Sequence, residues 1–173
     1  ENTGCRKRRQ RTCHSLEASS EPKVDELYCA PGNAGIADVA TCVDIKAEDI
    51  DGIRDFAVEN RIDMAVIGPE VPLAMGITDE LESAGLKVFG PNKKCSQLEA
   101  SKAFTKSFLA RHDIPTAKYK EYTDKEALKA DIGIYGYPMV IKADGLAAGK
   151  GVILAENAED AEKAIEEMMG EKV

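Results

Sequence analysis

The sequence predicts an α/β fold built around a parallel sheet. From residue 24 onward, apolar runs of strand length alternate with longer amphipathic segments, and turns containing Gly or Pro separate them. Strands that alternate with helices in this way usually lie parallel and are joined by right-handed crossovers. The hydrophobic content of 43% and the charged content of 31% are ordinary for a globular protein of 173 residues.

The first half of the chain supplies the elements of this sheet. A helix is predicted over residues 47–60, because Ile50, Ile53 and Ala57 fall on one face at helical spacing. The other expected elements are an apolar run at 39–43, a helix from Thr78 or Asp79 to Gly85, and strands at 27–30, 63–67 (a buried strand) and 86–89. Two of the strands stop at Pro- and Gly-containing turns, residues 31–33 and 68–70.

The second half predicts a helix over residues 101–111, with Phe104, Phe108 and Leu109 on its apolar side. The further expected elements are a strand at 118–122, a helix at 124–131, strands at 139–143 and 151–155, and a helix at 159–169. The last two strands flank a glycine-rich segment, residues 144–150, and should form an antiparallel hairpin with that segment at its tip.

The glycine-rich segment indicates nucleotide binding. Three glycines and two alanines within residues 145–151 let backbone N–H groups approach a phosphate, while Lys142 and Lys150 supply positive charge. The segment is not a Walker A motif, because its spacing is one residue short and Gly151 stands where Ser or Thr would hold magnesium. A flexible Gly/Ala hairpin with solvated lysines is the alternative.

Four motifs together resemble the phosphoribosylamine–glycine ligase family of the ATP-grasp superfamily. They are Ala30-Pro31-Gly32-Asn33-Ala34-Gly35, Ile67-Gly68-Pro69-Glu70-Val71-Pro72-Leu73, Ala100-Ser101-Lys102-Ala103-Phe104, and the run from Ile141 to Val152. The resemblance covers residues 23–173 without a gap. Biotin carboxylases and carbamoyl-phosphate synthetases share the layout but not these residues.

The resemblance implies a domain organisation. Residues 23–97 would form an N-terminal, pre-ATP-grasp, Rossmann-like domain that binds substrate, and residues 98–173 the incomplete beginning of an ATP-grasp domain. The implied reaction has ATP phosphorylate the carboxylate of glycine, after which the amine of 5-phosphoribosylamine attacks to give glycinamide ribonucleotide. The alternatives are another ATP-grasp carboxylate–amine ligase and a non-catalytic nucleotide-binding module. The chain alone is expected to be inactive.

The resemblance also implies which residues bind. ATP phosphates would contact Lys102 and Lys142, and the loop with Gly145, Ala148, Gly149, Lys150 and Gly151 would close over them. The residues implied for 5-phosphoribosylamine are Pro31, Gly32, Asn33, Gly68, Pro69, Glu70 and Pro72, with Glu70 on the ribose hydroxyls or the amine. Lys106, four residues after Lys102, is expected to be a solvated charge.

The expected cofactors are ATP and Mg²⁺. The magnesium ligands should lie beyond Val173, so no metal ligand is assigned within the chain, and Glu166 and Glu167 are expected on a solvated helix face. The partners would be the small substrates alone, 5-phosphoribosylamine and glycine. The absence of a long apolar run and the net charge of −8 predict a cytoplasmic protein that binds neither membrane nor nucleic acid. The resemblance further implies that the whole protein is monomeric.

The five cysteines, Cys5, Cys13, Cys29, Cys42 and Cys95, have no CxxC spacing and predict neither a disulfide framework nor a zinc site. The last three are expected in or near the core.

Residues 1–22 differ from the rest of the chain. Five basic residues and one acidic residue give residues 1–13 a local charge of +4. A member of the family should instead open with an apolar strand and a glycine-rich turn. Regrouping possible codons of residues 2–22 by one base yields ILVVGKGGREHAIAWKLAQSP, which is such a start. We therefore expect a frame shift corrected near Pro22, with a genuine basic tail, disordered or bound to an anionic partner, as the alternative.

Overall fold

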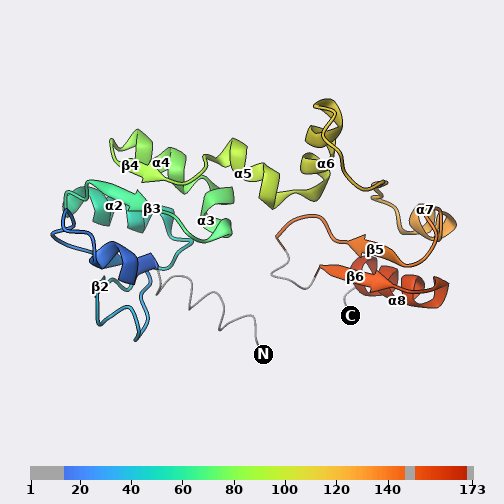
Figure 1. Cartoon of the computed structure of the whole chain (residues 1–173), viewed down its shortest axis with the longest axis horizontal. Coiled ribbons are helices and arrows are strands. Elements are labelled where there is room, and N and C mark those ends of the chain that lie inside the picture. Colours follow the sequence, from blue (N-terminus) through green and yellow to red (C-terminus); the bar gives the residue numbers. More distant parts are fainter. Residues whose placement is uncertain (1–13, 147–150, 171–173) are drawn as a thin grey trace. The chain divides into compact units, whose positions relative to one another are not determined.

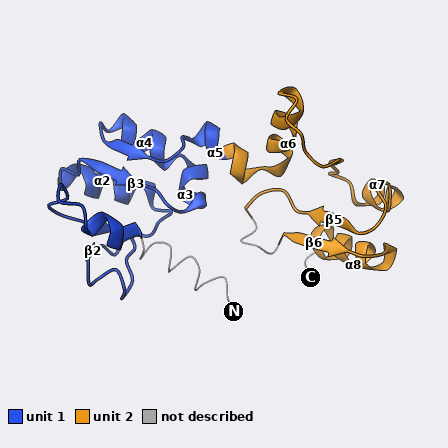
Figure 2. Cartoon of the chain, in the orientation of Figure 1, with its two compact units in different colours: residues 1–96 blue, residues 97–173 orange. Residues whose placement is uncertain are grey.

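A computed structural model describes residues 14–146 and 151–170 of the chain (Figure 1). The chain divides into two compact units, residues 1–96 and 97–173 (Figure 2). The division falls within helix α5 (Lys93–Ala100). Residues 14–19, which belong to the segment 1–22 that differs from the rest of the chain, are helical. Within the described ranges, no helix combines the length and apolar character needed to cross a bilayer.

Unit 1 contains two pairs of parallel strands. Strand β1 (Tyr28–Cys29) pairs with β2 (Thr41–Cys42), and β3 (Met64–Val66) pairs with β4 (Lys87–Phe89). The α/β class and the parallel pairing are therefore as predicted. The prediction of one sheet is wrong, because the described strands of unit 1 form two separate two-stranded sheets.

The core of unit 1 lies between the β3–β4 pair and two helices, α2 (Ile50–Glu59) and α4 (Ile77–Ser83). Ala57, Ile77 and Leu81 are buried at its centre. The residues that pack around them include Ile50, Ile53, Ala65, Ile67 and Val88. The predicted apolar face of the helix, with Ile50, Ile53 and Ala57, is thus confirmed.

The prediction that residues 63–67 form a buried strand is wrong for one face of β3. Met64 and Val66 are 54% and 59% exposed, and Phe89 on the neighbouring strand is 68% exposed. Side chains alternate between the faces of a sheet, and the core lies only on the side of Ala65 and Val88. Among the described residues, nothing buries the side chains on the other face of the pair.

Besides the helix at residues 14–19, two helices among the described residues were not predicted. Helix α3 (Glu70–Met75) begins directly after Pro69 and ends at Gly76, whose φ of +106° favours glycine. The turn at 68–70 is therefore a helix start. Pro72 is tolerated because it lies in the first turn, where a backbone N–H has no partner within the helix. Helix α5 is the second, and Asp79 accepts the Lys93 N–H at 2.7 Å where it begins.

Unit 2 is built on the predicted hairpin. Strand β5 (Met139–Lys142) pairs antiparallel with β6 (Val152–Ala155), and Lys142 lies opposite Val152. Helix α8 (Ala158–Met169) packs on this pair, with Ala155, Ala161 and Ile165 buried. Helices α6 (Lys102–Arg111) and α7 (Lys125–Ala130) complete the unit.

The strand predicted at residues 118–122 is absent from the described structure. Lys120 and Tyr122 instead direct their side chains to the carboxylate of Asp131, just after α7; the Tyr122 hydroxyl donates at 2.8 Å. The segment is thus held by side chains, and no described strand pairs with it. A run of strand-forming residues cannot by itself supply the neighbouring strand that a ladder needs.

The cysteine prediction is partly wrong. Cys42 and Cys95 are exposed, and only Cys29 is half-buried; all three are free thiols.

Candidate functional site

The glycine-rich loop begins where β5 ends. The Ala143 N–H donates to the Gly151 carbonyl at 2.8 Å, which closes the base of the loop one step beyond the last strand pair. Gly145 has a φ of +93°, in the region that favours glycine, and Gly151 is buried. Three predicted loop residues, Ala148, Gly149 and Lys150, lie outside the described residues.

The N-terminus of α6 lies against this loop base, and Asp144 makes the connection. The Asp144 carboxylate accepts the Lys102 N–H at 2.6 Å, the Ala103 N–H at 3.3 Å and the Ser101 hydroxyl at 3.0 Å. Ser101 in turn caps the helix by accepting the Phe104 N–H at 3.1 Å. Two side chains thus satisfy the first three N–H groups of α6.

These contacts also set the ionisation of Asp144. Burial acts to raise the pKa of the carboxyl, but hydrogen bonds from the Ala103 N–H, the Ser101 hydroxyl, the Lys102 N–H and the Gly145 N–H outweigh it. The net effect is a pKa below the ordinary value of 3.8. Asp144 is therefore a carboxylate at neutral pH, and its charge faces the positive end of the helix dipole.

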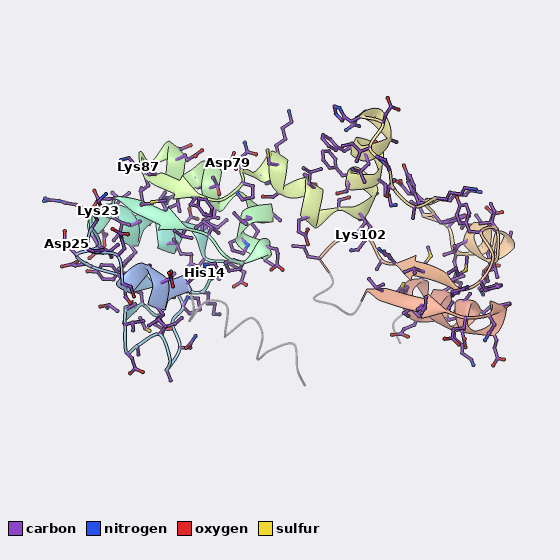
Figure 3. All side chains as sticks on the ribbon, in the orientation of Figure 1. His14, Lys23, Asp25, Asp79, Lys87 and Lys102 are labelled. Carbon is purple, nitrogen blue, oxygen red and sulfur yellow. The ribbon has the colours of Figure 1, made fainter. Side chains whose placement is uncertain are left out.

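Two lysines of α6, Lys102 and Lys106, have different hydrogen-bond partners. Lys102, at the N-terminal end of the helix (Figure 3), donates from Nζ to the Gly145 carbonyl at 2.8 Å. Lys106 donates to the Thr116 hydroxyl at 2.6 Å and the Ala117 carbonyl at 3.0 Å. The prediction that Lys106 is a solvated charge is wrong, because Lys106 holds the segment after α6 instead.

Lys142 is the last residue of β5 and its side chain is exposed. Within the part of the chain that the structure describes, its ammonium has no hydrogen bond or ion pair. The structure therefore brings Lys102 to Gly145 directly, and it places Lys142 two residues before the carboxylate that holds α6.

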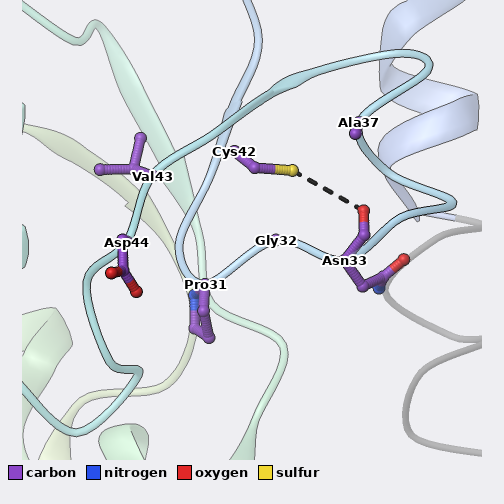
Figure 4. A pocket seen from close by; sticks show the side chains of 7 residues that line it. All are labelled: Pro31, Gly32, Asn33, Ala37, Cys42, Val43 and Asp44. Atoms are coloured by element: carbon purple, nitrogen blue, oxygen red, sulfur yellow. Dashed lines mark hydrogen bonds between the residues drawn. The ribbon is translucent and has the colours of Figure 1, made fainter.

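The residues predicted to bind substrate in unit 1 fall into two groups. Pro31, Gly32 and Asn33 line a pocket of about 300 Å³ after β1, which Ala37, Cys42, Val43 and Asp44 complete (Figure 4). The Cys42 thiol points to the Asn33 carbonyl at 3.8 Å across it. The second group, Gly68, Pro69, Glu70 and Pro72, lies at the start of α3 and does not line this pocket.

The residues of the second group differ from one another in how much space surrounds them. Pro72 is buried, whereas a Cβ atom added to Gly68 would meet no atom within 4 Å. Gly68 consequently has free space above its backbone at the end of β3, where a ligand could approach closely.

The described residues offer no group of three His, Cys, Asp or Glu side chains that could hold a metal ion. Glu166, expected on a solvated face, contacts Lys125 at 3.0 Å and also Lys129, both on α7. Its side chain is still 50% exposed, so the expected solvated face is retained at this residue, and its carboxylate also joins α8 to α7.

The hydrogen bond between Ser101 and Asp144 was not predicted from the sequence. The signal was an Asp directly after an apolar strand, together with a helix that opens Ser-Lys and has no acidic residue in its first turn. Sequence alone does not show that two positions 43 residues apart lie in contact.

Known proteins resemble the chain in sequence and fold. It is 52% identical over 160 residues to the phosphoribosylamine–glycine ligase of Yersinia pestis, covering 90% of this chain and 37% of the relative. The enzyme of the same name from Caldanaerobacter subterraneus is 46% identical over 161 residues, covering 92% and 38%. The chain thus spans little more than a third of the length of these relatives.

Two solved structures agree with the fold. The phosphoribosylamine–glycine ligase of Thermotoga maritima superposes with a TM-score of 0.68 at 27% identity, covering 88% of this chain and 35% of that one. A biotin carboxylase domain of a thermophilic 2-oxoglutarate carboxylase, bound to ADP, gives 0.51 at 21% identity, covering 86% and 36%, and shows the fold alone. Residues 8–99 match the N domain of phosphoribosylglycinamide synthetase and residues 100–173 its ATP-grasp (A) domain, so the chain belongs to the phosphoribosylglycinamide synthetase family.

Proposed function

We propose that the chain supplies the substrate-binding domain and the first phosphate-binding elements of a ligase that joins glycine to 5-phosphoribosylamine. ATP would phosphorylate the glycine carboxylate. The amine of 5-phosphoribosylamine would then displace phosphate from the glycyl phosphate, giving glycinamide ribonucleotide, ADP and phosphate. The family and the name shared by its relatives support this proposal.

The contact between Lys102 and Gly145 carries the proposal. It brings an ammonium group to the base of a glycine-rich loop whose supporting strand ends in a second lysine, Lys142. Phosphoryl transfer depends mainly on positioned cations and backbone donors around the phosphates. An ammonium has three donors and Lys102 uses one on Gly145, which leaves two for phosphate oxygens. Ala148, Gly149, Lys150 and Gly151 would contribute backbone donors, whereas the Gly145 N–H already donates to Asp144.

The pocket lined by Pro31, Gly32 and Asn33 is the proposed site of 5-phosphoribosylamine. Its volume of about 300 Å³ is at the lower end of the range for small-molecule sites. Gly68, Pro69, Glu70 and Pro72 would form a second part of the substrate site, with Glu70 on the ribose hydroxyls or the amine.

Magnesium would supply positive charge that offsets the charge of the ATP phosphates, but the described residues supply no cluster of ligands for it. We assign no magnesium ligand among the described residues. We also propose that the whole protein is cytoplasmic and monomeric, and that its only partners are the small substrates. The 173-residue chain by itself should bind nucleotide without completing the ligation.

A chimera tests the proposed reaction. Residues 23–173 would replace the corresponding part of the Yersinia pestis enzyme, and ADP release would be followed with glycine and 5-phosphoribosylamine. Turnover that requires both substrates supports the proposal. ADP release that requires a different carboxylate or amine would favour another ATP-grasp ligase. ATP binding by a folded chimera that never releases ADP would favour a non-catalytic nucleotide-binding module.

A further inference from the structure

Helix α6 begins with an unfavourable charge. Its first turn contains no acidic residue and opens with Lys102, so a cation stands at the positive end of the helix dipole. By contrast, α2, α4, α7 and α8 each have an acidic residue in the first turn. The carboxylate that α6 lacks comes from Asp144, which lies outside the helix.

The same aspartate lies between the two lysines of the proposed phosphate site. Lys142 ends β5 and precedes Asp144 by two residues. Lys102 is attached on the other side at two points, through its backbone N–H to Asp144 and through Nζ to the Gly145 carbonyl. Removing the Asp144 carboxylate therefore releases one of the two attachments that hold Lys102 beside the strand of Lys142.

We propose that Asp144 is a positioning residue, which fastens the N-terminus of α6 to the base of the glycine-rich loop and thereby sets the spacing of Lys102 and Lys142. This inference rests on the proposed function for its nucleotide-binding part. Because hydrogen bonds from four groups already compensate the Asp144 carboxylate, the residue can stand beside a phosphate site and contact no phosphate itself.

The first test measures the contact without nucleotide, on the 173-residue chain. Replacing Asp144→Ala should speed hydrogen exchange at the Lys102 and Ala103 amides on the order of tenfold, and Asp144→Asn, which keeps one acceptor oxygen, should have a smaller effect. In the unsubstituted chain, the NMR shifts of these two amides should titrate with a midpoint below 3.8. Unchanged exchange in Asp144→Ala would overturn the proposal.

Asp79→Asn is the matched control. Asp79 also accepts a backbone N–H at the start of a helix that has no acidic residue in its first turn, α5, but among the described residues it has no hydrogen bond or ion pair with the loop or its lysines. This substitution should speed exchange at Lys93 and leave Lys102 and Ala103 unchanged. If it loosens Lys102 and Ala103 equally, the Asp144 effect is one of general stability and the proposal fails.

The second test measures ATP affinity by calorimetry. Asp144→Ala should weaken ATP binding on the order of tenfold, Asp144→Asn should retain part of the affinity, and Asp79→Asn should retain all of it. Faster exchange with unchanged ATP affinity would contradict the positioning role. If the unsubstituted chain binds no ATP, the proposed function fails, and the exchange rates still decide whether Asp144 holds α6 to the loop.

Discussion

A Cβ atom added to Gly32 would lie 1.9 Å from the Sγ atom and 2.4 Å from the Cβ atom of Cys42. Both residues line the pocket after β1. The glycine at position 32 is therefore required by close packing against β2, whatever the pocket binds.

Gly32→Ala should consequently destabilise the chain by about 1–3 kcal/mol through overpacking. Urea denaturation measures the change in unfolding free energy. The double variant Gly32→Ala with Cys42→Gly should regain part of the loss, because only the Cys42 Cα, at 3.2 Å, then remains close. Gly68→Ala is the control and should be nearly neutral, since its Cβ meets nothing. Equal stability of the two single variants would contradict this packing argument.

Glu166 should make the contact between α7 and α8 dependent on pH. Hydrogen bonds from Lys129 and then Lys125 lower the pKa of its carboxyl below 4.5. A carboxyl whose pKa is lowered by folding stabilises the fold at pH values above its pKa in the unfolded state. This contribution is lost as the pH falls through its pKa in the folded state. Hydrogen exchange of the α7 amides should therefore be protected at pH 6 and less protected below pH 4.5.

Glu166→Gln should remove that pH dependence and leave α7 less protected at pH 6. Glu167→Gln is the control, because the neighbouring Glu167 has no ion pair within the described ranges. High salt should reduce the effect of Glu166, since the pair is exposed. A Glu167→Gln variant that behaves like Glu166→Gln would contradict the assignment.

The start of the chain yields a third prediction. Replacing residues 2–22 with ILVVGKGGREHAIAWKLAQSP should raise the thermal midpoint, because an added apolar strand can pair with the open edges of the two-stranded sheets in unit 1. A scrambled segment of the same composition should give no increase. Sequencing the coding DNA tests the origin directly: codons that do not spell this segment in the shifted frame would exclude a frame shift.

The sequence predicted those features that depend on local pattern. The hairpin of β5 and β6, the parallel pairing in unit 1 and the apolar face of α2 all follow from the spacing of apolar residues. Residues 118–122 had the pattern of a strand but no described partner strand. Pro72 obscured α3, because proline ends most helices and is tolerated only in the first turn.

The candidate site was predictable in its residue types and not in its contacts. Lys102 and Lys106 both lie on α6, and sequence spacing alone could not show that one meets Gly145 while the other meets Thr116. Asp144 was missed because its partners lie more than 40 residues earlier in the chain.

The ATP affinities of three lysine variants of the 173-residue chain test the central claim most directly. Lys102→Met and Lys142→Met should each weaken ATP binding by about tenfold or more, because each removes a charged donor to phosphate. Lys106→Met should bind ATP as the unsubstituted chain does, since Lys106 contacts Thr116 and Ala117 instead. Equal affinities for the unsubstituted chain, Lys102→Met and Lys142→Met would contradict the assignment of these two lysines to the phosphates.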